Sequence, residues 1–180
     1  MRRIITGHDE AGRSVFRSAE PFLPTVTSPR ADWFEAWATY ADDTLPIDAA
    51  EHTDRERYSE RHPAFPRVGE SYFRVLDFHP QDGPADSEAQ AEAAARLPGL
   101  AERLEAEDRS MHTTESVDYG VIISGRIMLE LDDGQTETLE AGDVFVQNGT
   151  RHAWRVTEPC RMAVVLTGVT RGGPAAGVSP

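Results

Sequence analysis

The sequence predicts an all-β protein whose strands form an antiparallel sandwich or barrel, and two observations support this. First, turn signals interrupt β-rich runs about every eight to ten residues between Met111 and Thr167. Second, apolar and polar residues alternate within the runs, so that Ile127 and Leu129 share one face and Met128 takes the other. We expect six short strands here, separated by Ser124-Gly125, Asp132-Asp133-Gly134, Ala141-Gly142-Asp143, Asn148-Gly149 and Glu158-Pro159.

Four further strands are expected before this segment. Residues 1–6 and Ser14–Ser18 predict a β-hairpin joined by a glycine-rich turn. Residues 32–40 and 71–78 alternate in the same way and predict two longer strands. The first three of these strands are added N-terminal strands of an arm that precedes the barrel, and the strand at 71–78 belongs to the barrel itself.

Two segments lack the period of a strand. Residues 41–70 are polar and rich in proline, which predicts a long loop with a helical turn around 48–60. Its two histidines, His52 and His62, are expected to be exposed to solvent. Residues 84–109 are rich in alanine and glutamate and predict a helical insertion, divided by Pro98-Gly99 into two short helices.

A chain of 180 residues fits a single domain with a sizeable core. We place this domain at residues 1–170, with a core barrel at about 68–168 and the N-terminal arm at 1–67. Residues 171–180 are rich in glycine, proline, alanine and serine, which predicts a disordered tail.

The charge of the chain excludes several classes of function. Its formal net charge is −13, from 31 acidic and 18 basic residues, which disfavours binding to nucleic acid and to anionic membranes. Every basic residue apart from histidine is arginine, because the sequence contains no lysine. Schiff-base chemistry, attachment of pyridoxal phosphate (PLP) and a phosphate-binding loop lysine are therefore excluded. We expect neither PLP nor a nucleotide cofactor.

Cys160 is the only cysteine, so an intrachain disulfide is not possible. We expect this thiol to be structural, because no neighbouring residue indicates a lowered pKa. The N-terminus lacks an apolar stretch typical of a signal peptide, and no run of residues is apolar enough to span a membrane. The sequence therefore predicts a soluble cytoplasmic protein.

Two histidines and an aspartate are the candidate metal ligands, and strand parity places two of the three on one face. His112, Thr114 and Asp118 are all even-numbered, so an unbroken strand places them on one face. His152 begins another strand, which can face the first across a closed barrel. Two histidines and one carboxylate form a set suited to Fe(II), and usable by Zn or Mn, that leaves positions open for substrate.

The same residues resemble the two sequence motifs of the cupin superfamily. The first motif, G-x5-H-x-H-x3-4-E-x6-G, is matched by His112, Thr114 in place of the second histidine, Asp118 in place of glutamate, and Gly125. The second motif, G-x5-P-x-G-x2-H-x3-N, is matched at Gly142, Gly149 and His152, while Gln147 and Val156 replace proline and asparagine. The resemblance covers roughly residues 68–168 and implies a double-stranded β-helix, a jelly-roll-like barrel.

The resemblance also implies a function inside the barrel, and a homodimer. His112, Asp118 and His152 would bind one divalent ion (Fe, Mn, Ni or Zn) and carry the chemistry. Two alternatives to a metal site remain open: a metal-free acid–base site, in which Asp118 orients a histidine, and a structural polar cluster. Thr114, Trp154 and Arg74 are the candidate substrate-binding residues, although Arg74 instead pairs with surface acids if its face of the strand turns outward. His79 is a candidate extra ligand or acid near the mouth.

The expected function is that of a metal-dependent lyase, isomerase or cyclase that acts on a carbonyl- or hydroxyl-bearing organic molecule. An Fe(II) dioxygenase using the same three residues is the first alternative. A non-catalytic cupin that binds a small molecule is the second. The fold alone does not choose among these.

Overall fold

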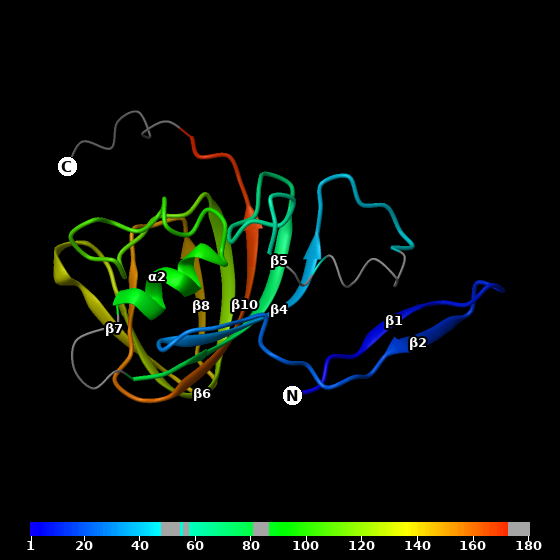
Figure 1. The fold of residues 1–180 in the computed structure, drawn as a ribbon, viewed down its shortest axis with the longest axis horizontal. Coiled ribbons are helices and arrows are strands. Elements are labelled where there is room, and N and C mark those ends of the chain that lie inside the picture. The colour runs from blue at the N-terminus through cyan, green and yellow to red at the C-terminus, as the bar shows by residue number, and fades with distance from the viewer. Residues whose placement is uncertain (48–54, 56–57, 81–86, 173–180) are drawn as a thin grey trace.

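The computed structural model describes residues 1–47, 55, 58–80 and 87–172, and it confirms the all-β cupin fold (Figure 1). Almost all regular structure is antiparallel strand, accompanied by one short helix and one 3-10 turn, η2 (Asp132–Gly134), in this part of the chain. His52, residues 173–180 and most of the helical turn expected at 48–60 lie outside the described residues.

One strand, β6 (Ser116–Glu130), links the two halves of the barrel. Its first half pairs with β10 (Cys160–Gly168) on one side and β8 (Val144–Asn148) on the other. Its second half pairs with β7 (Thr136–Glu140) and β9 (Ala153–Arg155). Beyond β10 the sheet continues through β5 (Ser71–Phe78), β4 (Ala31–Thr39) and β3 (Val26–Thr27).

The predicted turn at Ser124-Gly125 is wrong, because β6 runs through it. The register with β10 shifts by one residue close to this point, and Gly125 takes a φ of 74°. The shift changes which residues point inward: even-numbered Ile122 is buried before it, and odd-numbered Ile127 after it. The segment 111–167 therefore contains five strands instead of six, and a bulge bends one of them from one sheet to the other.

The main core lies between these sheets. It consists of apolar side chains from β5, β6, β7 and β10, namely Leu76, Ile122, Ile127, Leu139, Cys160, Met162, Val164 and Leu166. Burial raises the pKa of the Cys160 thiol to about 11, which agrees with the structural role predicted for it.

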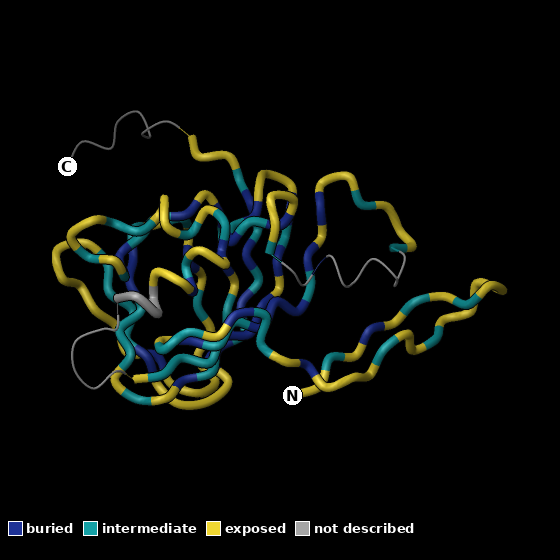
Figure 2. The backbone as a smooth tube through the Cα atoms, in the orientation of Figure 1, coloured by how far each residue is buried: buried dark blue, intermediate teal, exposed yellow. Residues whose placement is uncertain are grey.

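The N-terminal hairpin is confirmed, and it forms a two-stranded sheet of its own. Strands β1 (Ile5–His8) and β2 (Ser14–Ser18) project away from the barrel in Figure 1 and are largely exposed in Figure 2. The outer face of the main sheet also exposes apolar side chains, Tyr119 and Val146 among them, which stand opposite each other in the register of β6 and β8. The homodimer remains a prediction.

The helical insertion is shorter than expected. Helix α2 (Ser87–Ala95) is present, but the second predicted helix is wrong, because residues 96–103 form turns. The carbonyl of Pro98 accepts a hydrogen bond from Ala64 N at 2.8 Å, and Leu97 is buried against Ala64 and Val26. These tertiary contacts hold the segment in turns despite its helical composition. No helix among the described residues is long and apolar enough to span a membrane.

Gly125 provides a test of the bend. A Cβ atom at this position would lie 1.9 Å from the Pro159 carbonyl oxygen, and the φ of 74° is unfavourable for other residues. We expect Gly125→Ala to lower the free energy of unfolding, measured with urea, by about 3 kcal/mol or more.

Gly134→Ala is the matched control. Gly134 has a φ of 69° but open space where its Cβ would stand, so it should lose only about 1 kcal/mol from backbone strain. Equal losses in the two variants would show that the close approach of β6 to Pro159 does not matter.

Candidate active site

The barrel encloses a cavity of about 480 Å³. Its wall is mainly apolar and includes Trp33, Phe65, Leu76, Phe78, Phe145 and Leu166. All six predicted site residues line this one cavity, namely Arg74, His112, Thr114, Asp118, His152 and Trp154. An apolar cavity with a few converging polar groups is the usual form of a small-molecule site.

His112 and His152 lie on neighbouring backbone segments that hydrogen-bond to each other. The His112 N–H donates to the His152 carbonyl at 3.0 Å, and the His152 N–H donates back at 2.9 Å. This pairing brings the two ring centroids to 4.3 Å. Strand pairing, which the sequence did not specify, therefore places both imidazoles together.

Both imidazole rings are fixed in the same tautomer. The Nδ1 of His112 is 3.0 Å from the Ser110 carbonyl oxygen, and the Nδ1 of His152 is 2.9 Å from that of Thr150. Since a carbonyl only accepts, each Nδ1 must carry the hydrogen, and each Nε2 keeps its lone pair. Burial lowers the pKa of both imidazoles. The pKa of His152 falls to about 4, because the nearby His112 adds to the effect of burial. The rings are therefore neutral at physiological pH.

Asp118 is buried in the cavity wall, with 6% of its surface exposed. Its Oδ1 accepts a hydrogen bond of 2.6 Å from the Ser116 hydroxyl, whose Oγ also lies 3.1 Å from Thr114 Oγ1. Desolvation raises the pKa of Asp118 to about 6, although the Ser116 hydrogen bond and the charge of Arg74 oppose this shift. Asp118 can thus gain or lose a proton near neutral pH.

The two histidines and Asp118 differ in how well they fit a metal ion. Neutral imidazoles with their Nε2 lone pairs free, and their Nδ1 atoms bound to carbonyl oxygens, are typical metal ligands. However, no group of three His, Cys, Asp or Glu side chains within the described part of the chain is placed to share one ion. The structure therefore fits a two-histidine ligand pair, and it does not bring Asp118 into a three-residue set with them.

Arg74 points into the barrel and is 2% exposed, so the alternative in which it pairs with surface acids is wrong. Its Nε lies 3.0 Å from Glu35 Oε2, and its Nη2 donates to the Ala64 carbonyl at 2.8 Å. The contact between Nε and Glu35 is an ion pair rather than a well-aligned hydrogen bond. These contacts occupy the Nε–Nη2 edge of the guanidinium, one of the two edges through which an arginine can bind a carboxylate with two hydrogen bonds.

A buried polar cluster behind Arg74 is the main feature that sequence analysis missed. His62, expected to be exposed, is fully buried and stacks on Tyr72 with ring centroids 4.3 Å apart. Its Nδ1 is 3.2 Å from Tyr40 Oη, and its Nε2 is 3.5 Å from Glu35 Oε1. The signal was the position of Glu35 among aromatic residues in a strand, since such a carboxylate must find partners when buried.

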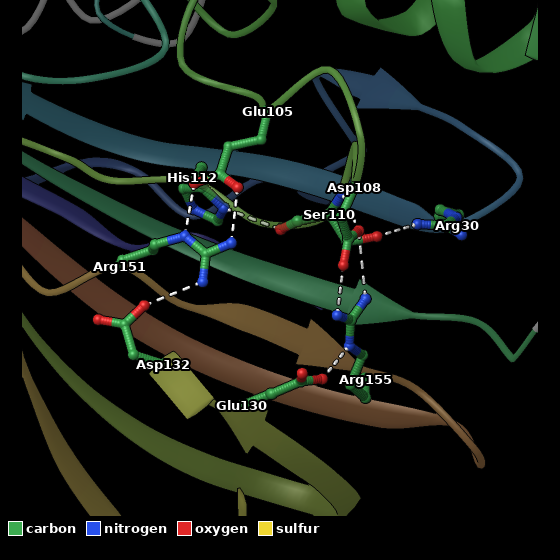
Figure 3. A network of polar contacts seen from close by, with 9 residues as sticks. All are labelled: Arg30, Glu105, Asp108, Ser110, His112, Glu130, Asp132, Arg151 and Arg155. Atoms are coloured by element: carbon green, nitrogen blue, oxygen red, sulfur yellow. Dashed lines mark hydrogen bonds and ion pairs between the residues drawn. The ribbon is translucent and has the colours of Figure 1, made fainter. Parts of the chain in front are cut away.

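The segment that carries His112 is held on the barrel by arginines (Figure 3). Arg151 binds Glu105 through two hydrogen bonds of 2.6 Å and Asp132 at 2.9 Å. Arg155 binds Glu130 at 2.6 Å and also Asp108, whose pKa its guanidinium lowers to about 2. Because Glu105 and Asp108 both precede His112 closely, these pairs fix the approach of His112 to the cavity.

His79 and Trp154 occupy two other parts of the wall. His79 Nε2 lies 3.2 Å from Asp32 Oδ2, and 42% of the His79 side chain is exposed. Trp154 packs edge-on against Phe145, with ring centroids 5.1 Å apart, and lies 6.1 Å from the His152 ring. The ring of Trp154 therefore extends the apolar wall beside the histidine pair.

Comparisons with known proteins agree with this architecture. The cupin domain model matches residues 102–166. Phomopsin biosynthesis cluster protein C' of Diaporthe leptostromiformis is 34% identical over 85% of this chain and 69% of its own length. The cupin-domain-containing oxidoreductase fogC of Aspergillus ruber is 30% identical over 91% of this chain and 70% of its own. Together these matches show that the chain belongs to the cupin superfamily.

Two further similarities complete the comparison. Oryzines biosynthesis cluster protein J of Aspergillus oryzae is 29% identical over 92% of this chain and 80% of its own length. Among solved structures, ethanolamine utilization protein Q of Salmonella typhimurium LT2 aligns with a TM-score of 0.43 at 9% identity, over 94% of this chain and 98% of that one.

The raised pKa of Asp118 predicts a pH-dependent cost to stability in metal-free protein. Above pH 6 the folded state holds this carboxylate buried and charged, whereas below 3.8, the ordinary pKa of an aspartate, the group is neutral in both folded and unfolded states. Asp118→Asn should therefore be more stable than the native protein by about 3 kcal/mol well above pH 6. This advantage should disappear as pH falls below 4.

The measurement is urea unfolding at a series of pH values. Glu137→Gln, at an exposed position of β7, is the control and should follow the native protein throughout. An Asp118→Asn difference that is constant with pH would contradict the assignment.

Proposed function

We propose that this protein is a cupin-type enzyme that acts on a small organic molecule bound inside the barrel. The observation that carries the proposal is the convergence of a neutral histidine pair and a carboxylate of raised pKa on one apolar cavity. Shifted pKa values in an enclosed cavity are typical of catalytic groups. The relatives named as oxidoreductases support an enzymatic role in general.

The proposed reaction is that of a lyase, isomerase or cyclase, in which a proton moves on a substrate bearing a carbonyl or hydroxyl group. His112 and His152 would hold one divalent ion (Fe, Mn, Ni or Zn) through their Nε2 atoms. When bound, such an ion supplies Lewis-acid polarisation of a substrate oxygen. Asp118 would take or return the proton, because its pKa of about 6 lies close to the working pH.

The surrounding residues have supporting roles in this proposal. The Ser116 hydroxyl holds Asp118 Oδ1, which leaves Oδ2 without a hydrogen bond from any described residue. Thr114 Oγ1 would donate a hydrogen bond to a substrate oxygen, and Trp154 would pack against a flat part of the substrate. The apolar wall excludes water, which strengthens each polar contact that the substrate makes.

A second candidate is an Fe(II) dioxygenase that uses the same histidine pair. The names of three relatives, which are cupin-domain-containing oxidoreductases, favour it. Consumption of O2 distinguishes the two candidates. Uptake of O2 by Fe(II)-loaded protein during turnover would favour the dioxygenase, and turnover that continues unchanged without O2 would favour proton-transfer chemistry.

The metal part of the proposal predicts near-stoichiometric Fe, Mn, Ni or Zn in tag-free protein, measured by elemental analysis. His112→Ala and His152→Ala should each reduce the metal content to below about a tenth, because each removes one of two protein ligands.

His8→Ala, on the exposed hairpin, is the matched control and should keep the native metal content. If protein from metal-supplemented growth carries no metal, or if both cavity variants retain it, the metal-dependent mechanism is wrong. Acid–base catalysis by Asp118 and a histidine, or simple binding, would then replace it.

A further inference from the structure

Two arginines at the mouth of the cavity have no carboxylate partner among the described residues. Arg30 lies in the turn before β4, and Arg109 lies in the loop before His112; both are exposed and both line the cavity. The other two arginines of the described cavity wall, Arg74 and Arg155, are paired with buried or half-buried carboxylates.

The side chain of Arg30 is attached to the segment that carries Arg109. Arg30 Nη1 donates a hydrogen bond of 2.7 Å to the hydroxyl of Ser110, the residue next to Arg109 in the chain (Figure 3). The carbonyl of Ser110 in turn accepts the Nδ1 hydrogen of His112 at 3.0 Å. The Arg30 guanidinium therefore lies against the short segment that also carries Arg109, directly before His112.

The carboxylates around the mouth do not face the cavity. Asp108 is bound by Arg155, and Asp32 is bound by His79. Neither aspartate lines the cavity, and Asp118 is the one carboxylate among the described lining residues. Although the chain has a net charge of −13, the described wall of the cavity thus presents the positive charges of Arg30 and Arg109, and the carboxylates that neutralise Arg74 and Arg155 lie outside the lining.

We infer that the cavity binds an amphipathic organic anion, with its apolar body inside and its carboxylate held at the mouth by Arg30 and Arg109. This inference rests on the proposed function, because it names the substrate class of the same site. Guanidinium groups bind carboxylates through paired, charge-assisted hydrogen bonds. Arg74 is less suited to this contact, since Glu35 and the Ala64 carbonyl already occupy its Nε–Nη2 edge.

The apolar part of the wall next to the mouth fits the body of such a molecule. It is formed by α2 and the turns that follow it together with strand residues, and includes Phe78, Ala93, Leu97, Leu100, Leu104 and Val156. An acid bound by its carboxylate at the two arginines would direct its apolar end toward these side chains. The product of such a reaction would keep the same anionic group.

Calorimetry with phenylbutanoate and its neutral amide, phenylbutanamide, tests the inference, because the two probes share a shape and differ in charge. At low ionic strength the native protein should bind the acid about tenfold more tightly, as expected for charge-assisted hydrogen bonds. The double variant Arg30→Gln/Arg109→Gln should lose this preference through weaker binding of the acid. Its unchanged affinity for the amide would show that the cavity is intact.

Arg2→Gln/Arg17→Gln is the matched control, because it removes the same charge from exposed positions of the N-terminal arm. It should keep the preference for the acid. Equal affinity of the native protein for both probes, binding of neither, or a preference that survives in the Arg30/Arg109 variant would overturn the inference. Calorimetry detects binding without requiring turnover or a bound metal ion. Failure of the anion-binding inference can therefore be distinguished from failure of the proposed reaction.

Discussion

The bend in strand β6 is the constraint on which the rest of the structure depends. One strand of 15 residues pairs with four neighbours, and it does so only because it leaves one sheet at Gly125 and enters the other. The extra residue at the bulge reverses which side chains point inward. Before the bend the inward face carries Ser116, Asp118 and the core residue Ile122, and after the bend it carries Ile127. The same strand therefore contributes both polar and apolar side chains to the interior of the barrel.

Charged side chains are unfavourable in the apolar interior unless they are paired or neutralised. The buried ionisable groups of this protein satisfy this requirement in two ways. Asp118, His112 and His152 shift their pKa values toward neutral forms, because burial disfavours the charged form of each. Glu35 and Arg74 instead form a buried ion pair with each other. The cavity wall therefore contains two neutral imidazoles, one carboxyl group that exchanges a proton near neutral pH, and the buried ion pair of Arg74 with Glu35.

The loop before His112 illustrates how surface charge positions a buried group. Its carboxylates, Glu105 and Asp108, bind Arg151 and Arg155 from the strand side of the barrel. Single exposed ion pairs contribute little to stability, but several that share one segment restrict its position. Their effect here is geometric, because they hold His112 against His152 while the mouth beside them presents Arg30 and Arg109.

The sequence by itself determined the antiparallel fold, the hairpin, the strand at Ser71–Phe78 and the inward face of Asp118, because strand parity and turn residues are local properties. The unbroken strand expected through His112, Thr114 and Asp118 is wrong, since β6 begins at Ser116 and His112 is placed by its bridge to His152. The sequence did not determine that β6 continues through Ser124-Gly125, that residues 96–103 form turns, or that His62 is buried. Each of these depends on contacts with residues distant in the chain: the Pro159 carbonyl, the Ala64 backbone, and Glu35 with Tyr72. Only tertiary packing decided them, since it outweighs local propensity wherever a backbone or charged group must find a partner.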